Sequence, residues 1–449
     1  MSSAVEALRQ ALATRGVRYL MPTYVDIHGV SKTKVVPVAH IARMADGSEL
    51  CTGAALDGVP QDISDEEVAA HPDLDSLAVL PWNPEIAWFA SDLYCHDEPF
   101  PACSRGIFKR VLAAAADMGL RFDWGIETEF FLLRRDADGR VRPASDADVL
   151  DKPCYDLRGL IDNLDYLDEL VAAMNGLGWD VYSFDHEDAN GQFEIDFMYT
   201  DGLRMADRFV FFRLLARELA HRRGLFASFM PKPFADRTGS GAHYNMSLAD
   251  RETGRNLFAS SDDPRGCQLG TPGYHFIAGV LRHAAAITAV IAPTVNSYKR
   301  LVRRGNMSGF TWAPIFACYG NNNRTNMLRI PRGGGRVECR AADIACNPYL
   351  GGALILAAGL EGIREELDPG APHTENMYRY DEDDVRAMGI ELLPASLGEA
   401  IDALAADPLA REVMGDLMFE TYVDFKRAEW ESYLNHVSDW EVRRYLKFF

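Results

Sequence analysis

Four short segments of the sequence carry acidic or imidazole side chains at spacings that suit metal binding. They read WGIETEFFLL, DHEDANGQFEIDF, RTGSGAHYNMSL and GGGRVECRAAD. In the first, Glu127 and Glu129 lie two residues apart in an apolar run, so on a strand both carboxylates point to one face. Carboxylates that share a buried face repel each other unless a cation lies between them. The segment therefore indicates a metal site rather than a pair of surface charges.

The second segment repeats this arrangement across a turn. Glu187 and Glu194 flank Asn190-Gly191-Gln192, a sequence that favours a turn and would fold both acids back towards one point. Oxygen ligands in this number suit Mg²⁺ or Mn²⁺ better than zinc. The pattern therefore predicts a carboxylate cage for hard divalent cations.

The third segment places one imidazole among polar strand residues. His243, Asn245 and Ser247 alternate along one face of a predicted strand, and Gly239 and Gly241 upstream let a ligand approach the backbone closely. A single histidine is more often a hydrogen-bonded structural residue than a metal ligand. Its interpretation as a ligand depends on whether the acids converge on it.

The fourth segment combines an acid with several guanidinium groups. Arg336, Glu338 and Arg340 alternate, which places the carboxylate between two arginines, and NNNRTNMLRIP upstream adds Arg324 and Arg329. Guanidinium groups bind phosphate oxygens through paired hydrogen bonds. In phosphoryl transfer, metals bridge the polyphosphate and arginines absorb the charge that develops on the migrating group. The segment therefore predicts phosphoryl-transfer chemistry.

The elements that position these side chains divide into two unequal domains. We expect residues 1–102 to form a small domain with a helix over residues 1–17, and residues 103–449 to alternate helices with the motif-bearing strands. The expected fold class is α+β, with a curved antiparallel sheet backed by helices. The tail from Ser396 has the pattern of two or three amphipathic helices, with these packing positions: Leu404, Leu409, Met414, Leu417 and Phe419.

Composition indicates a soluble cytoplasmic enzyme. The 449 residues carry a formal net charge of −20, which disfavours nucleic acid or an anionic membrane as a partner. The eight cysteines form no Cys-x-x-Cys pair, so we expect reduced thiols. We expect no signal peptide, and the apolar stretch YHFIAGVLRHAAAITAVIAP contains Arg282 and His283, which favours a buried helix over a membrane span.

Taken together, these segments resemble those of glutamine synthetases, from about Tyr24 to the C-terminus. GIETEFFL, HEDANGQFE, MPKPF, GSGAHYNMSL, APTVNSYKRL, NNNRTNMLRIP and RVECRAADIACNPYL occur in the family's order and at its approximate spacings. DHEDANGQFE and MSGFTWAP are most similar to the bacterial branch that includes type III GlnT-like enzymes and glutamate–methylamine ligases. The resemblance implies that the N-terminal domain is a β-grasp domain.

The resemblance also implies roles for individual positions. Two or more divalent cations, Mg²⁺ or Mn²⁺, would be held by two sets of ligands: Glu129, Glu187 and Glu194, and Glu127, His243 and Glu338. The remaining positions would bind glutamate (Arg300, Gly239), bind ATP (Asn245, Ser247, Arg329, Arg336), or act on the reacting carboxylate and phosphoryl group (Arg340, Arg324). The implied reaction forms γ-glutamyl phosphate from glutamate and ATP, and an amine then displaces phosphate.

Three positions depart from the ammonia-using enzymes of the family. In the loop ELCTGAALDGVPQD, one alignment places Thr52, and a shifted one Asp57, where those enzymes have an amine-binding aspartate; the spacing favours Thr52. Trp312 stands where a glutamate is expected, and Asn245 replaces the second histidine of His-x-His. An aromatic wall suits an alkyl group better than a bare ammonium ion.

The sequence therefore predicts an ATP-dependent glutamate–amine ligase that uses methylamine or another small alkylamine. Ammonia is the next candidate, then a polyamine, and a non-catalytic scaffold is disfavoured because all six metal ligands are present. The family implies a homo-oligomer, a dodecamer of two stacked hexameric rings with active sites between adjacent subunits. Tyr378 lies near a tyrosine that some relatives adenylylate, and a packing role is the alternative.

Overall fold

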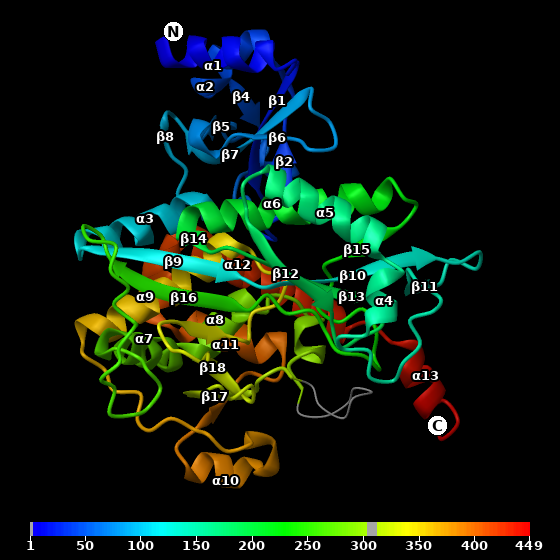
Figure 1. Cartoon of the computed structure of the whole chain (residues 1–449), viewed down its shortest axis with the longest axis vertical. Helices are drawn as coiled ribbons and strands as arrows, with labels where there is room; N and C mark the ends of the chain where they lie inside the picture. Colours follow the sequence, from blue (N-terminus) through cyan, green and yellow to red (C-terminus); the bar gives the residue numbers. More distant parts are fainter. Residues whose placement is uncertain (1–2, 303–311) are drawn as a thin grey trace.

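The computed structural model describes residues 3–302 and 312–449. An N-terminal unit lies at one end of the molecule, next to the layers that carry the motifs (Figure 1). The helix expected over residues 1–17 is α1 (Ser3–Thr14). Of the motif MSGFTWAP, only residues 312–314 belong to the described part of the chain, and the first five lie outside it.

Eight short strands form the N-terminal sheet. Its pair β1 and β7 is parallel, with Leu20 opposite Ala87, and the other pairs are antiparallel. Leu12, Leu20 and Phe89 pack with α2 (Ile41–Ala45) in a small separate core. The boundary at residue 102 stays a prediction. The strands are β1 (Tyr19–Val25), β2 (Ser31–Thr33), β3 (Val36–Pro37), β4 (Glu49–Cys51), β5 (Val68–Pro72), β6 (Ala78–Val79), β7 (Ile86–Cys95) and β8 (Glu98–Pro99).

Two further sheets carry the motif-bearing strands. The first is antiparallel throughout and comprises β10 (Thr128–Arg135), β11 (Val141–Pro143), β12 (Val181–His186), β13 (Gln192–Phe197) and β15 (Phe226–Ser228). The second runs β14 (Thr200–Asp201), β9 (Leu120–Ile126), β16 (Tyr244–Asp250), β19 (Val337–Cys339), β18 (Asn326–Ile330), β17 (Phe316–Asn321) and β20 (Glu391–Leu392). Its β17 and β18 pair in parallel, so the sheet is mixed rather than wholly antiparallel.

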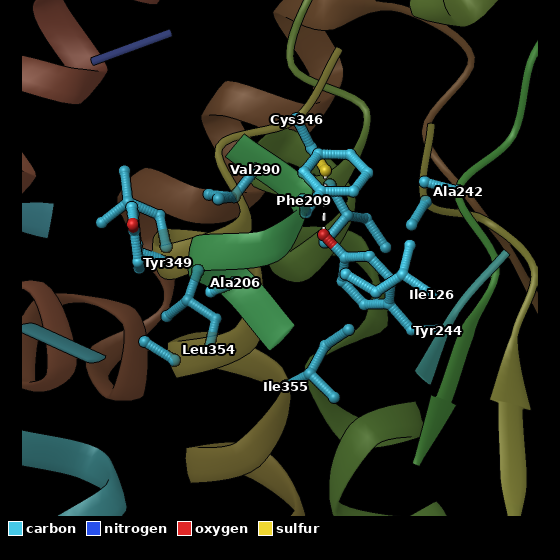
Figure 2. Packing of buried hydrophobic residues seen from close by; sticks show 14 of the residues in the cluster. Ile126, Ala206, Phe209, Ala242, Tyr244, Val290, Cys346, Tyr349, Leu354 and Ile355 are labelled. Carbon is cyan, nitrogen blue, oxygen red and sulfur yellow. Dashed lines mark hydrogen bonds between the residues drawn. The ribbon is translucent and has the colours of Figure 1, made fainter. Parts of the chain in front are cut away.

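Helices pack behind these sheets and confirm the α+β class (Figure 1). In the main core, the Tyr244 hydroxyl lies 2.8 Å from Cys346 Sγ among side chains of α6, α8 and α9 (Figure 2). A Cβ on Gly279 would lie 1.9 Å from the Ala358 carbonyl oxygen, so only glycine allows α7 to cross α9 this closely. The helices are α3 (Ser104–Asp117), α4 (Leu157–Ile161), α5 (Leu164–Gly176), α6 (Gly202–His221), α7 (Thr271–Arg282), α8 (Ala284–Ile291), α9 (Pro348–Arg364), α10 (Glu382–Ala387), α11 (Leu397–Ala406), α12 (Pro408–Leu434) and α13 (Asp439–Tyr445).

Two expectations about helices can be compared with these elements. Across residues 3–302 and 312–449, no single helix is long and apolar enough to cross a membrane, and α7 with α8 meets that test only as a pair bent by 79°. The C-terminal helices form, but the packing role expected for Leu417 is wrong, because its side chain is 40% exposed. Gly415 has φ 74° and interrupts α12 two residues before Leu417.

Candidate active site

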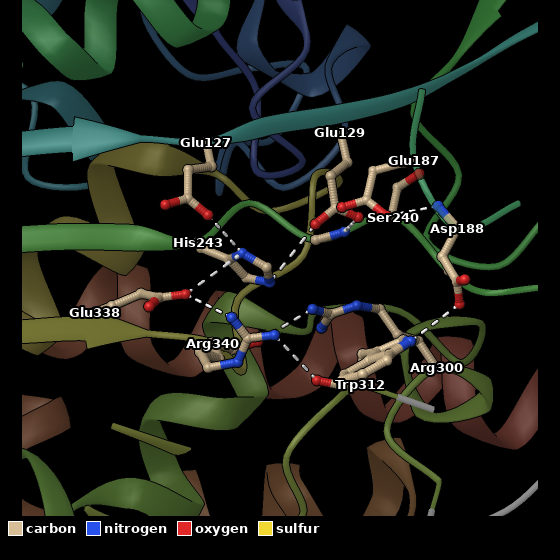
Figure 3. A network of polar contacts seen from close by, with 12 residues as sticks. Glu127, Glu129, Glu187, Asp188, Ser240, His243, Arg300, Trp312, Glu338 and Arg340 are labelled. Carbon is tan, nitrogen blue, oxygen red and sulfur yellow. Dashed lines mark hydrogen bonds and ion pairs between the residues drawn. The ribbon is translucent and has the colours of Figure 1, made fainter. Parts of the chain in front are cut away.

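Glu127 and Glu129 lie where β9 gives way to β10, facing the segment that carries His243 (Figure 3). The Glu127 backbone N–H donates to the His243 carbonyl (3.1 Å), and that of Glu129 donates to the Gly241 carbonyl (3.4 Å). Glu127 lies between the two strands rather than on one of them, contrary to the expected strand pair. Because the backbone stays extended, both carboxylates still line one cavity.

The His243 imidazole lies among three of the carboxylates. Its Nδ1 is 2.8 Å from Glu127 Oε2 and 3.6 Å from Glu338 Oε1, and its Nε2 is 3.6 Å from Glu129 Oε1. Burial and the neighbouring Arg340 lower the pKa of His243 to about 3, so the ring is neutral and can offer a lone pair to a metal. Two groups have ligand atoms within 4.8 Å of one another: Glu127, His243 and Glu338, and Glu129, Glu194 and His243.

Glu194 lies on β13, whereas Glu187 directly follows β12 in the segment that joins the two strands and contains Gly191 at φ 78°. Burial and the nearby Glu129 raise the pKa of Glu187 to about 8. Burial and Glu127 raise the pKa of Glu194 well above its usual value. A divalent cation would relieve this repulsion, so the donor set fits a hard metal ion.

The position of Glu187 differs from the predicted ligand sets. It lines the same cavity, but its atoms belong to neither of the two close groups, and His243 stands in its place beside Glu129 and Glu194. Glu187 Oε2 accepts a hydrogen bond from the Asp188 backbone N–H at 2.6 Å, which turns the carboxylate towards its own loop.

Glu338 is fully buried between the guanidinium groups of Arg340 and Arg329, whereas the sequence predicted Arg340 and Arg336. Arg340 Nη1 donates to Glu338 Oε1 (2.6 Å) and Arg329 Nη1 to Oε2 (2.5 Å), whereas Arg336 Nε donates to Asn245 Oδ1 (2.9 Å). The reason is strand register, because β18 places Arg329 directly opposite Glu338. Burial acts to raise the pKa of Glu338, but Arg340, His243 and Arg329 together outweigh it and hold that pKa below its usual value.

A cavity of about 520 Å³ contains the acids together with four arginines. Arg300 is buried, and its two terminal nitrogens donate to the carbonyls of Ala341 (3.1 Å) and Arg340 (3.0 Å). A Cβ on Gly239 would lie 2.4 Å from the Pro231 carbonyl oxygen, so a side chain there would not fit. The other predicted site residues in this wall are Arg324, Arg329, Arg340 and Trp312.

A second cavity, of about 530 Å³, adjoins the first and shares Glu127 and Asp196 with it. Asn245 Nδ2 donates to Glu127 Oε1 at 2.8 Å, and its Oδ1 accepts from Arg336. The predicted nucleotide residues Asn245, Ser247 and Arg336 line this cavity, whereas Arg329 lines the first one.

The amine-loop candidates lie apart from both cavities. Thr52 is exposed, with Oγ1 3.4 Å from Glu67 Oε1, and Asp57 lies 3.6 Å from His28 Nε2. Neither residue lines either of these two cavities in the described part of its own chain, so the structure does not bring them to the carboxylate cage. Their position in a neighbouring subunit's site stays a prediction.

Several polar side chains of the site were missed from the sequence: Asp185, Asp196 and Thr238 line the first cavity, and Gln192 and Asp188 make defined contacts there. Gln192 Nε2 donates to Glu129 Oε2 at 3.1 Å and so orients this acid. Asp188 lines the first cavity and accepts a hydrogen bond from the Thr238 hydroxyl (2.9 Å). It accepts another from the Trp312 indole N–H (3.0 Å) (Figure 3). Gln192 and Asp188 both lie in the segment DHEDANGQ, so the available signal was their closeness to predicted metal ligands.

Comparison with known proteins agrees with this geometry. The sequence model of the family "Glutamine synthetase, catalytic domain" matches residues 101–445. The chain is 43% identical over 442 residues to a glutamate–methylamine ligase of Methyloversatilis universalis, covering 98% of this chain and 99% of that protein. It is 39% identical over 429 residues to a glutamine synthetase of Rhizobium meliloti, covering 95% and 96%.

Solved structures show the same relationship. A structure described as a GmaS/ADP complex superposes with a TM-score of 0.91 at 40% identity, covering 98% of this chain and 99% of that one. An apo GmaS structure superposes with a TM-score of 0.88 at 39% identity, with the same coverage. The chain therefore belongs to the glutamine synthetase family.

Proposed function

We propose that this protein is an ATP-dependent ligase that joins glutamate to methylamine or another small alkylamine through γ-glutamyl phosphate. One observation carries the proposal. A buried cage of carboxylates around His243 opens into a cavity with four arginines, in a chain whose relatives include a glutamate–methylamine ligase.

The carboxylate cage suits two or more Mg²⁺ or Mn²⁺ ions. When bound, such ions would neutralise negative charge on a polyphosphate. Glu129 is held ready for this by Gln192 and by the Gly241 backbone N–H, which donates to its Oε2 at 2.7 Å. The ligands assigned are Glu127, Glu129, Glu187, Glu194, His243 and Glu338.

The arginines of the first cavity divide the work on glutamate and phosphate. Arg300 binds the α-carboxylate of glutamate, with the Gly239 backbone packed against it as support. Arg340 acts next to the reacting γ-carboxylate, and Arg324 stabilises the phosphoryl group in transfer. Because Arg340 is anchored by Glu338, its charge is in position before the substrate arrives.

The second cavity takes the nucleotide, with Asn245, Ser247 and Arg336 in its wall and Arg329 reaching from the first cavity. The two cavities share Glu127. A triphosphate that lies across this boundary would bring its terminal phosphate beside the glutamate.

Trp312 supports an alkylamine, because an aromatic ring in the cavity wall favours contact with a methyl group. Ammonia is the second candidate, since the relatives also include glutamine synthetases. A polyamine is the third, and the exposed acids near Thr52 favour it: Asp57, Asp62, Asp65, Glu66 and Glu67.

The assembly we propose is a dodecamer of two stacked hexameric rings in the cytoplasm. Its active sites would lie between adjacent subunits, completed by the loop at Thr52 or Asp57. The exposure of this loop and its distance from the cavities of its own chain support that assignment.

The amine is tested by measuring ATP-dependent phosphate release with glutamate and each of ammonium, methylamine, ethylamine and putrescine. We expect kcat/KM for methylamine to exceed that for ammonium by about tenfold or more, which corresponds to one methyl group in an apolar pocket. A rate with ammonium far above all the others would refute the alkylamine assignment.

The Thr52→Asp variant tests whether Thr52 or Asp57 occupies the amine-binding position of the loop. If Thr52 occupies the amine-loop position, the new carboxylate should raise kcat/KM for ammonium several-fold, at about the strength of an exposed ion pair. Asp57→Asn is the matched variant. If Thr52→Asp has no effect and Asp57→Asn weakens amine use, Asp57 holds the position.

A further inference from the structure

A buried ion pair lies next to the turn that carries Glu187, and neither of its side chains lines the two cavities of the site. His186, the last residue of β12, is completely buried, and its Nε2 lies 2.7 Å from Oδ2 of Asp148, 38 residues earlier in the chain. Its Nδ1 lies 2.7 Å from the Glu187 carbonyl oxygen. An ionised carboxylate and a carbonyl oxygen only accept hydrogen bonds, so both ring nitrogens donate and the ring carries a positive charge.

Asp148 also accepts hydrogen bonds from the far side of the same turn. Its Oδ2 accepts from the Gly191 backbone N–H at 2.6 Å, and its Oδ1 accepts from Asn190 Nδ2 at 2.7 Å. Hydrogen bonds to an ionised carboxylate are about twice as strong as those between neutral groups. One buried carboxylate therefore ties together both ends of the segment that runs from His186 to Gly191.

Close packing holds the His186 ring in this position. A Cβ on Gly159, in α4, would lie 2.7 Å from His186 Cδ2, so a side chain there would not fit beside the ring. The Phe193 ring packs against it edge-on, with the two centroids 5.2 Å apart. The Tyr155 backbone N–H donates to the His186 carbonyl at 2.8 Å. The ring is therefore fixed by contacts from several elements.

Glu187 is the predicted metal ligand that belongs to neither group of converging ligand atoms. Its Oε2 accepts from the Asp188 backbone N–H at 2.6 Å (Figure 3). Its own backbone is held on both sides, because its carbonyl accepts from His186 and its N–H donates to the Gln192 carbonyl at 2.9 Å. Fixing the backbone of one residue costs about 1–2 kcal/mol. With the backbone already fixed, only side-chain torsions remain to be set when the carboxylate meets a metal.

We propose that Asp148 and His186 are positioning residues for the metal site, which hold the turn so that Glu187 completes the ligand set of Glu129 and Glu194. This rests on the proposed function, in which Glu187 binds a metal. The pair contacts neither metal nor substrate and acts through the backbone of the turn. Loss of an outer partner that orients a metal ligand typically costs about 10- to 100-fold in metal affinity or activity.

Asp148→Asn tests the proposal, because it removes the charge and keeps a side chain of the same size. We expect the dissociation constant for Mn²⁺, measured by titration calorimetry without substrates, to rise about 10- to 100-fold at the site that Glu187 serves. Turnover at low Mg²⁺ should fall, and saturating Mg²⁺ should restore it to within about threefold of wild type by mass action. Asp151→Asn, an exposed acid of the same loop, is the matched control and should change neither value.

Two further variants show whether the effect passes through Glu187. Glu187→Gln alone should weaken the same metal site, and adding Asp148→Asn to it should weaken binding by less than about twofold more, because coupled residues are not additive. His186→Gln keeps a donor towards Asp148 and loses the one towards the Glu187 carbonyl. We expect it to raise the dissociation constant about three- to tenfold, the range for one hydrogen bond. If Asp148→Asn does not fold, His186→Gln carries the test.

Three results would overturn the proposal. The first is an unchanged Mn²⁺ affinity in folded Asp148→Asn or His186→Gln protein, and the second is a loss of turnover that saturating Mg²⁺ does not restore. The third is full additivity in the double variant, which would show that Asp148 acts without Glu187. If Glu187→Gln itself binds metal normally, the ligand assignment of the proposed function is wrong, and this proposal fails with it. If Glu187→Gln weakens metal binding and Asp148→Asn does not, only the positioning role is wrong.

Discussion

Two regions of the molecule bury several acidic side chains, and they differ in how the charge is balanced. Beside α3, the carboxylates of Asp73, Asp92 and Asp207 contact the one guanidinium of Arg105 at 2.7, 2.9 and 3.0 Å. Around His243, the acids outnumber the cationic contacts that they make within residues 3–302 and 312–449, and two of them have strongly raised pKa values.

This difference separates a structural cluster from a binding site. Burial acts to lower the pKa of Arg105, but Asp207 and its other acidic neighbours outweigh it, so every acid there has a permanent charged partner. The acids around His243 repel one another until a cation binds. An excess of buried like charge, rather than the number of buried charges, therefore identifies the site.

The largest effect should come from removing one acid of the cage. Glu129→Ala should reduce turnover with any amine by more than about 100-fold, because a metal loses a direct ligand. Urea unfolding without divalent metal should show equal or greater stability, since one repelling charge is gone. Glu252→Ala, on an exposed turn, is the control. Near-normal turnover in Glu129→Ala would contradict the ligand assignment.

Removing the shared cation from the cluster around Arg105 should destabilise the fold. Arg105→Leu leaves the buried Asp92 and Asp207 and the half-buried Asp73 without their shared partner, so the free energy of unfolding should fall by about 3–5 kcal/mol. Urea titration at neutral pH measures this. Arg110→Leu, at an exposed position of the same helix, should cost less than about 0.5 kcal/mol. Equal losses in the two variants would remove the distinction between the regions.

Divalent metal should stabilise the protein only through the acids around His243, and not through the Arg105 cluster. Mg²⁺ or Mn²⁺ at 100 times its dissociation constant should stabilise the wild-type protein by about 2.7 kcal/mol. The metal should stabilise the Arg105→Leu variant by the same free energy, and the Glu129→Ala variant by much less. Thermal unfolding with NaCl of matched ionic strength as the control measures the increments. A full gain in Glu129→Ala would show that the metal binds elsewhere.

The smallest effect concerns a third, mixed cluster at the junction of α7 and α8. Burial acts to lower the pKa of His283, but hydrogen bonds with Asp407 (2.7 Å) and Glu361 (2.6 Å) raise it above its usual value. Its contribution to stability should be complete below the unfolded pKa of about 6.5 and disappear as pH rises through the raised value. The stability difference between wild type and His283→Gln should therefore shrink with rising pH. A difference that grows would contradict this sign.

Much of the site could be predicted from local pattern. The turn at Asn190-Gly191-Gln192 forms as expected, and every predicted metal ligand lines the first cavity or, in the case of Glu338, contacts two residues that do. Turn chemistry and strand alternation depend on neighbouring residues, so they can be read before the fold is known.

The partners of these side chains could not be predicted in the same way. Glu338 contacts Arg329 rather than Arg336, and the ligand atoms that converge with those of Glu129 and Glu194 are those of His243 rather than Glu187. The first depends on the register between β18 and β19, and the second on how the hairpin turn orients its own carboxylate.

The sequence by itself determined which residues could bind metal, phosphate and glutamate, because those properties belong to side-chain types and short spacings. Only the tertiary structure decided which of them meet. The contact of Trp312 with Asp188 joins positions 124 residues apart, and the contact of Arg336 with Asn245 joins positions 91 apart. Such contacts depend on how separate strands and loops pack against a common core, and no local pattern encodes that packing.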